Sequence, residues 1–282
     1  MSAAIYDHPA ISQRYFFPQM GPPPSPLPSG SSLHIDAEGL AIQGYEHHPF
    51  PGAPTALYFH GNGERIADQL ENWPAWAEAA GINMLFVDYP GYGASAGDPS
   101  LSSCRAAARG ALAYLLARPS LEVPYVLVAG RSVGSIFALD VARQCPPERL
   151  GGLWLESAVA DVGERLALRV PYESSGLDRD TVERAVARDF DHRQTLGELA
   201  CPLSILHTLG DSLVSADNAE RLASWSGEDV EVTWLEGDHN TIQWLNAARY
   251  PQMLRDWAGR SSAYMNANWP LQTPPVFTKL TK

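Results

Sequence analysis

Gly130-Arg131-Ser132-Val133-Gly134 follows a short apolar run, Tyr125 to Ala129, that is typical of a buried parallel strand. After it, apolar residues recur at helical spacing over residues 135–143. A strand, a tight turn flanked by glycines and a helix together predict a nucleophile elbow, in which the turn strains the serine backbone and presents its hydroxyl above a sheet. The alternative is an ordinary glycine-rich turn that carries a serine by chance.

Strand-like and helix-like segments alternate outward from this turn. The alternation predicts an α/β fold, with a mostly parallel sheet flanked by helices on both faces and ligands bound at the C-terminal ends of the strands. The first two strands are expected to pair as a hairpin through Ala37-Glu38-Gly39. Strands are expected over residues 33–36, 40–45, 53–59, 83–87, 125–129, 152–155, 203–207 and 230–235, and helices over 66–80, 101–117, 132–143, 217–225 and 241–257.

Three segments fall outside this alternation. Residues 1–30 are expected to form a proline-rich arm, and residues 9–30 within it are expected to be extended and to contain no helix. Residues 158–200 lack a convincing strand and carry amphipathic helical pieces, which predicts a small helical cap inserted over the sheet. Residues 259–282 show little periodicity and are expected to be a tail, so the main domain would span residues 31–258.

Composition limits the partners and the compartment. The 282 residues carry a formal net charge of −12, which argues against nucleic acid or an anionic membrane surface as partner. The three cysteines are widely spaced, so neither a disulfide framework nor a metal site is indicated. No apolar run is long enough for stable membrane insertion, and no secretory signal is evident. We therefore expect a cytoplasmic protein, whose oligomeric state the sequence leaves open.

A serine hydroxyl is a poor nucleophile at neutral pH and needs a base. His239 is the candidate, because it follows the last predicted strand in Glu236-Gly237-Asp238-His239-Asn240. That position places it at the sheet edge where Ser132 is also expected. The alternative is a histidine that caps the last helix.

The base needs a carboxylate that fixes its tautomer and stabilises the imidazolium form. Asp211 follows the predicted strand 203–207 and precedes His239 by room for one helix and one strand. The chain order Ser132, Asp211, His239 is that of the α/β-hydrolase layout. Glu156, which follows the preceding strand, is the rival acid.

Acyl transfer also needs hydrogen-bond donors for the oxyanion that develops on the carbonyl oxygen. One donor is expected to be the backbone N–H of Val133, directly after the serine. The other is expected from the loop His60-Gly61-Asn62-Gly63, where the backbone N–H of Asn62 is the choice. The alternative for this loop is a plain turn. This chemistry requires no metal and no organic cofactor.

Four other histidines are interpreted as structural or peripheral. His207 lies within an apolar strand and is expected to be buried, whereas His47 and His48 are expected in a solvated loop without a ligand set for a metal. His192 falls in the expected cap, where a substrate contact is left open.

Six motifs occur in the order found in one known family. They are His60-Gly61-Asn62-Gly63, Asp88-Tyr89-Pro90-Gly91-Tyr92-Gly93-Ala94-Ser95, Gly130-Arg131-Ser132-Val133-Gly134, Leu155-Glu156-Ser157, Gly210-Asp211 and Gly237-Asp238-His239-Asn240. Over about residues 53–257 the chain resembles the α/β-hydrolase-fold serine hydrolases of the Bem46 and ABHD13/17-like group. One departure is Ser135, where the group commonly has a second glycine.

This resemblance implies a Ser132/Asp211/His239 triad that hydrolyses ester or thioester bonds of a small-molecule acyl substrate through an acyl-enzyme intermediate. Two alternatives stay open. The same triad could belong to an amidase or peptidase, and a hydrolase-like fold can also serve as a non-catalytic binding module. Ser132 argues against dehalogenases and epoxide hydrolases, which use an aspartate at the elbow.

Overall fold

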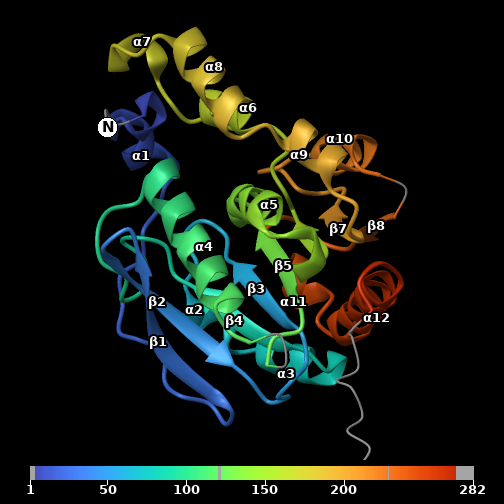
Figure 1. Cartoon of the computed structure of the whole chain (residues 1–282). Helices are drawn as coiled ribbons and strands as arrows, with labels where there is room; N and C mark the ends of the chain where they lie inside the picture. The colour runs from blue at the N-terminus through green and yellow to red at the C-terminus, as the bar shows by residue number, and fades with distance from the viewer. Residues whose placement is uncertain (1–3, 120–121, 228, 271–282) are drawn as a thin grey trace, which may run out of the picture.

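One sheet of eight strands forms the centre of the computed structural model, which describes residues 4–119, 122–227 and 229–270 (Figure 1). The strand order is β1-β2-β4-β3-β5-β6-β7-β8. The pairs β1–β2 and β2–β4 are antiparallel, and all other neighbouring pairs are parallel. The strands are β1 (Gly30–Ala37), β2 (Leu40–His47), β3 (Thr55–Phe59), β4 (Asn83–Val87), β5 (Val126–Arg131), β6 (Leu150–Glu156), β7 (Leu203–Thr208) and β8 (Val230–Leu235).

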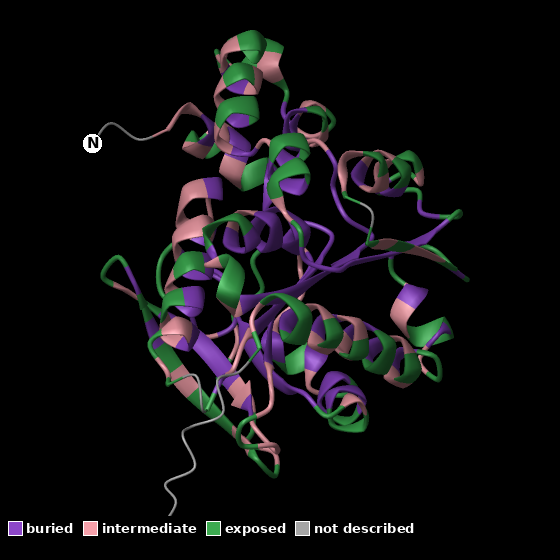
Figure 2. Ribbon diagram, turned by 45° about the vertical axis from the view of Figure 1, so that its right-hand side comes forward, coloured by how far each residue is buried: buried purple, intermediate pink, exposed green. Residues whose placement is uncertain are grey.

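Helices cover both faces of this sheet, and the strands between them are buried along their length (Figure 2). Strands buried on both faces read as continuous apolar runs, which is why the central ones could be found in the sequence. One face carries α2 (Ile66–Gln69), α3 (Trp73–Ala80), α11 (Ile242–Leu245) and α12 (Tyr250–Asn268). The other carries α4 (Leu101–Leu116), α5 (Gly134–Gln144), α9 (His192–Glu198) and α10 (Asp217–Trp225).

The predicted α/β fold is confirmed, and each of the eight predicted strands overlaps an observed one. Two predicted helices are each divided in two. The expected helix 66–80 is interrupted before Trp73, because Pro74 fits the first turn of a helix better than its interior. Likewise, α12 starts anew at Tyr250, with Pro251 in its first turn.

The tail prediction is wrong in part, because α12 continues to Asn268 and so includes residues 259–268. Tyr264 and Met265 pack inward from this last stretch, Met265 being buried. The buried positions of α12 keep a helical spacing up to Met265, but the one after Trp257 is Ser261, so the apolar pattern in the sequence stops at Trp257. The remainder of the predicted tail, residues 271–282, lies outside the described residues.

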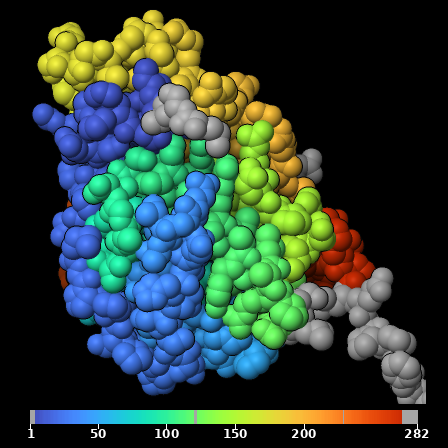
Figure 3. Space-filling view, turned by 60° about the vertical axis from the view of Figure 1, so that its left-hand side comes forward, coloured from blue at the N-terminus to red at the C-terminus, as the bar shows by residue number. Residues whose placement is uncertain are grey.

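The expectation of an N-terminal arm without a helix is wrong as well. A short 3-10 helix, η1 (Ile5–Asp7), leads into α1 (Pro9–Tyr15), whose Pro9 occupies the first turn. The arm packs on α8 (Arg179–Asp189), where the Tyr6 hydroxyl donates to Asp189 Oδ2 at 2.8 Å. Figure 3 shows this N-terminal segment in blue against the yellow segment that follows β6. The proline content of the arm favoured an extended conformation in the sequence analysis, but α1 forms there and tertiary contacts stabilise it.

The predicted insertion between β6 and β7 contains the short helices α6 (Val162–Ala167) and α7 (Tyr172–Ser175), followed by α8 and α9 (Figure 1). That this insertion forms a separate cap remains a prediction.

His47 was expected in a solvated loop, and this is wrong: it ends β2, is buried, and its Nε2 lies 2.9 Å from Glu78 Oε1. Among the described residues, no helix combines the length and apolar character needed to cross a membrane.

Candidate active site

The turn after β5 holds Ser132 in the left-handed region, with φ of +52°. Its backbone N–H donates to the Glu156 carbonyl at 2.9 Å, which fixes the turn to the end of β6. Both flanking glycines are required by space. A Cβ on Gly134 would lie 2.1 Å from the Phe59 carbonyl oxygen, and one on Gly130 would lie 2.5 Å from the Gly134 carbonyl oxygen. The geometry is therefore that of the predicted elbow, with strain stored at the serine.

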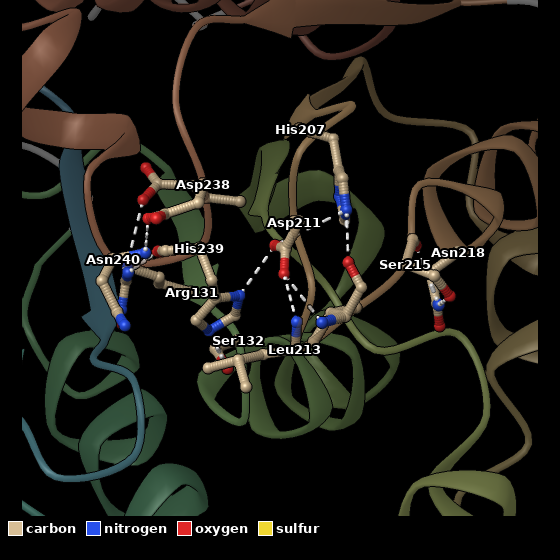
Figure 4. A network of polar contacts seen from close by, with 12 residues as sticks. Arg131, Ser132, His207, Asp211, Leu213, Ser215, Asn218, Asp238, His239 and Asn240 are labelled. Atoms are coloured by element: carbon tan, nitrogen blue, oxygen red, sulfur yellow. Dashed lines mark hydrogen bonds and ion pairs between the residues drawn. The ribbon is translucent and has the colours of Figure 1, made fainter.

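Ser132, His239 and Asp211 form a continuous chain of polar contacts (Figure 4). The Ser132 Oγ lies 3.0 Å from His239 Nε2, and His239 Nδ1 lies 2.7 Å from Asp211 Oδ2. The residues follow β5, β8 and β7, respectively, at the C-terminal edge of the sheet. Each is only 6% exposed, so this chain of contacts is largely shielded from bulk water.

The Asp211 carboxylate is bound on both oxygens. Its Oδ1 accepts the backbone N–H groups of Leu213, at 3.0 Å, and Val214, at 2.8 Å. Burial alone would raise the pKa of Asp211, but the hydrogen bonds from His239 and from these N–H groups outweigh it and lower the pKa. Asp211 is therefore an ionised acceptor for the His239 ring.

His207 supports the same loop and is buried, as expected. Its Nε2 lies 2.9 Å from the Val214 carbonyl oxygen and 3.7 Å from Asp211 Oδ2 (Figure 4). Burial lowers the pKa of His207, which favours the neutral ring. A neutral donor to the Val214 carbonyl leaves Asp211 free to pair with His239.

Glu156, the rival acid, is engaged elsewhere. Its carboxylate accepts from the Arg131 Nε at 3.0 Å, from Gln243 Nε2 at 2.9 Å and from the Tyr250 hydroxyl at 2.8 Å. It is fully buried and serves as counter-ion to Arg131. The structure therefore brings Asp211, and not Glu156, to the His239 imidazole.

Arg131 is a residue of this site that sequence reasoning missed. Its guanidinium donates to Glu156, to Glu64 Oε1 and to the backbone carbonyl of His239. Glu64 in turn accepts the backbone N–H of Gly61 at 2.9 Å. A charged residue immediately before the serine, at the end of an apolar strand, was the available signal, because a buried arginine needs acidic partners.

Asn62 and Val133, the predicted oxyanion donors, line a cavity of about 20 Å³ together with Ser132. Within the described residues, neither backbone N–H donates to a carbonyl oxygen of the turns and loops. The cavity has room for little more than one water molecule. Cavities of about 400 and 520 Å³ lie elsewhere, so size alone does not identify this site.

The side chain of Asn62 ties its loop to two other segments. Its Oδ1 accepts the Tyr92 hydroxyl at 2.7 Å and the Phe17 backbone N–H at 2.8 Å, and its Nδ2 donates to the Tyr15 carbonyl. The N-terminal arm therefore packs directly over the candidate oxyanion loop. Sequence reasoning did not foresee this contact, because the arm lies outside the motifs.

Ser135, the departure from the family pattern, has a definite structural role. Its Oγ donates to the Ser132 carbonyl at 2.6 Å and accepts the Val159 N–H at 3.0 Å, which links the elbow to the start of the insertion.

His192 does not line the Ser132 cavity. It is buried, with Nδ1 3.0 Å from the Val159 carbonyl oxygen, and burial lowers its pKa.

No protein-family model matches the chain. The Bem46 protein of Schizosaccharomyces pombe is 28% identical over 130 residues, which are 46% of this chain and 43% of that protein. The α/β-hydrolase domain-containing protein 17B of Xenopus laevis is 24% identical over 192 residues, 67% of this chain and 61% of that protein. The chain thus covers less than two thirds of the length of either relative.

Among solved structures, the esterase Pf2001 of Pyrococcus furiosus superposes with a TM-score of 0.64 at 14% identity. The superposition covers 87% of this chain and 98% of that one. This likeness shows the α/β-hydrolase fold. Together with the two relatives, it confirms the predicted resemblance to the Bem46 and ABHD13/17-like group.

Proposed function

Since the chain has the α/β-hydrolase fold and resembles the Bem46 and ABHD13/17-like group, we propose that it is a serine hydrolase. Its substrates would be carboxylic esters or thioesters of small acyl compounds. The observation that carries the proposal is the contact chain from Ser132 through His239 to Asp211, built on a strained turn. Fold alone would not support an activity, because this fold hosts many functions.

In the proposed reaction, the Ser132 Oγ attacks the carbonyl carbon while His239 Nε2 accepts its proton. Asp211 accepts the hydrogen bond from Nδ1–H, so the ring has the tautomer with a free Nε2. The carbonyl oxygen becomes an oxyanion, for which the N–H groups of Val133 and Asn62 are the expected donors. These donors would stabilise the tetrahedral intermediate more than the substrate.

Collapse of this intermediate breaks the bond to the leaving group, which takes the proton from His239 Nε2. An acyl group then remains on Ser132. Water attacks it by the same route, with His239 as base, and releases the carboxylic acid and free enzyme. Every proton in this cycle is held by a side chain of the chain itself or by water, so no step calls for a metal or an organic cofactor.

A fluorophosphonate probe tests the nucleophile directly. We expect stoichiometric labelling at Ser132 and no labelling of a folded Ser132→Ala variant. The matched control is Ser174→Ala, at an exposed serine of α7. Ester, thioester and anilide analogues of one acyl group then separate ester or thioester hydrolysis from amidase activity. A folded wild-type chain that neither takes up the probe nor hydrolyses any analogue would favour a non-catalytic binding module.

A further inference from the structure

Two arginines border the cavity at Ser132. Arg165 lies on α6, Arg169 lies two residues beyond the end of that helix, and both line the cavity with Ser132 and Tyr15. Both side chains belong to half-buried residues. Neither residue is needed for the proposed acyl transfer, so their charge requires another explanation.

The acidic residues of α6 and its cap are paired with a different arginine. Arg221 donates to both Glu164 oxygens, at 2.6 and 3.2 Å, and lies 3.8 Å from Asp161 Oδ2. Among the described residues, no carboxylate lies within ion-pair distance of Arg165 or Arg169. In the part of the chain that the structure describes, two cations without an ion-pair partner therefore line the cavity.

The two cations also lie near one another. The charges of both oppose the pKa increase that burial causes at the Tyr15 hydroxyl. Burial lowers the pKa of Arg165, and the charge of Arg169 adds to that effect. Asp211 is the acid that favours the charged form of Arg165, but its oxygens are committed to His239 and to two backbone N–H groups. Partial burial of like charges is unfavourable, and a bound anion would relieve it.

Each guanidinium has donors left for a ligand. Arg165 donates through Nη1 to the Leu213 carbonyl, and the Arg169 guanidinium lies 5.7 Å from the centre of the Phe17 ring. A guanidinium carries five N–H donors in a planar fork that matches carboxylate and phosphate oxygens. The net charge of the chain is −12, whereas the charge of these two arginines is positive. The positive charge is therefore local to the site and is not a property of the surface as a whole.

We propose that Arg165 and Arg169 form an anion-binding subsite, so that the preferred substrate is an ester or thioester with a carboxylate or phosphate near the scissile bond. This inference rests on the proposed hydrolase function. The small volume at Ser132 means that a substrate must displace lining side chains to enter. The two long arginine side chains would do so by turning onto the anionic group, which would then be held beside the nucleophile.

Two pairs of probes test the subsite and distinguish the position of the charge. In the first pair the acyl part carries it: 4-nitrophenyl hydrogen adipate is compared with its methyl ester. In the second pair the leaving part carries it: 4-acetoxybenzoate is compared with its methyl ester, and release of the acetyl group is followed. We expect the anionic member of at least one pair to have a kcat/KM about tenfold or more above its neutral partner. Increasing salt should reduce that preference.

The arginine variants identify the source of the preference. Arg169→Gln and Arg165→Gln should each reduce the charged-to-neutral ratio about tenfold, mainly through KM. Arg169→Lys and Arg165→Lys should each retain part of this ratio, because the charge remains while the planar fork of donors is lost. The ratio is compared within each variant, so a general effect of Arg165 on the Leu213 loop cancels. Arg193→Gln, an exposed residue of α9 outside the cavity lining, is the control and should keep the wild-type ratio.

The two levels of the proposal fail differently. If the wild type hydrolyses neutral and charged members of both pairs equally well, or if the preference survives Arg169→Gln and Arg165→Gln, the anion subsite is wrong while the hydrolase stands. If no ester is hydrolysed and Ser132 takes up no fluorophosphonate, the hydrolase proposal itself has failed.

Discussion

The guanidinium of Arg131 donates a hydrogen bond to the backbone carbonyl of His239, so the residue beside the proposed nucleophile holds the loop of the proposed base. The same side chain reaches the candidate oxyanion loop through Glu64. Gly61 is part of this arrangement, because a Cβ there would lie 2.7 Å from the Arg131 Nη1. One buried cation thereby connects three loops from different parts of the sequence.

Arg131 is therefore expected to act as a positioning residue. Arg131→Lys keeps the charge but loses the planar fork, so the loops of His239 and Gly61 should lose their fixed spacing. We expect kcat to fall at least tenfold with a smaller change in KM, together with slower fluorophosphonate labelling of Ser132. A purely structural role for Arg131 would reduce stability and leave the kinetics of the folded fraction unchanged.

Two further variants serve as controls for the Arg131→Lys measurement. Arg109→Lys is the matched control, because Arg109 also makes a bidentate pair, with Asp140 at 2.7 Å, but lies outside the lining of the Ser132 cavity. Arg131→Met should instead destabilise the fold by about 3–5 kcal/mol, because it leaves the buried Glu156 without its counter-ion. Denaturant unfolding measures that loss. Wild-type labelling kinetics in Arg131→Lys would contradict the positioning role.

The two acids near the site should differ sharply in their effect on kcat. Asp211→Asn preserves shape but favours the wrong tautomer of His239, so kcat should fall on the order of 10³- to 10⁴-fold. Glu156→Gln should affect stability more than catalysis, because its partners are Arg131, Gln243 and Tyr250. Side-by-side kcat values and unfolding curves check both effects. The opposite ranking would assign the triad acid to Glu156.

Patterns that are local in sequence predicted most of the fold. The central strands, buried on both faces, read as apolar runs, and Ser132 sits in a turn whose glycines are required by neighbouring backbone. The arm could not be predicted in the same way. Its helix α1 is seven residues long and depends on packing against other segments, which no local period reveals.

In the candidate site, too, some residues could be predicted from local sequence patterns and others could not. Ser132, His239 and Asp211 follow three strands, so chain order was sufficient to select them. The contacts of Arg131 and Asn62 join residues 25 to 108 positions apart in the sequence, and such pairings follow from the folded topology alone. Glu156 looked equivalent to Asp211 by position, and only its partners in space distinguish the two.

Acid pH should affect activity and stability through different groups. The lowered pKa of Asp211 means that its stabilising effect is fully present above the ordinary aspartate pKa of about 3.9 and is lost as pH falls through the lowered value. Asp211 thus stays ionised over the range from about pH 5 to 8, where histidines change charge. We therefore expect kcat/KM to rise with pH over that range, because a general base must be unprotonated to accept the proton of the serine hydroxyl.

Initial rates from pH 5 to 8, with and without a chelator, test this profile. Chelation should leave the curve unchanged, because the proposed cycle has no metal-dependent step. Unfolding experiments from pH 5 down to pH 3 should show wild type losing more stability than Asp211→Asn. Activity that declines steadily from pH 5 to 8 would point to another catalytic group.

Two helical glycines should respond in opposite ways to the same substitution. In Gly134→Ala the new Cβ would lie 2.1 Å from the Phe59 carbonyl oxygen, which is backbone and cannot move aside cheaply. We expect a loss of about 1–3 kcal/mol or more in the free energy of unfolding, together with a displaced elbow and slow labelling of Ser132. In Gly259→Ala, on α12, nothing lies within 4 Å of the new Cβ, and alanine is the better helix former, by up to about 1 kcal/mol. Thermal unfolding of the two variants in parallel measures both signs. Equal midpoints would show that the close approach at the elbow does not constrain the turn.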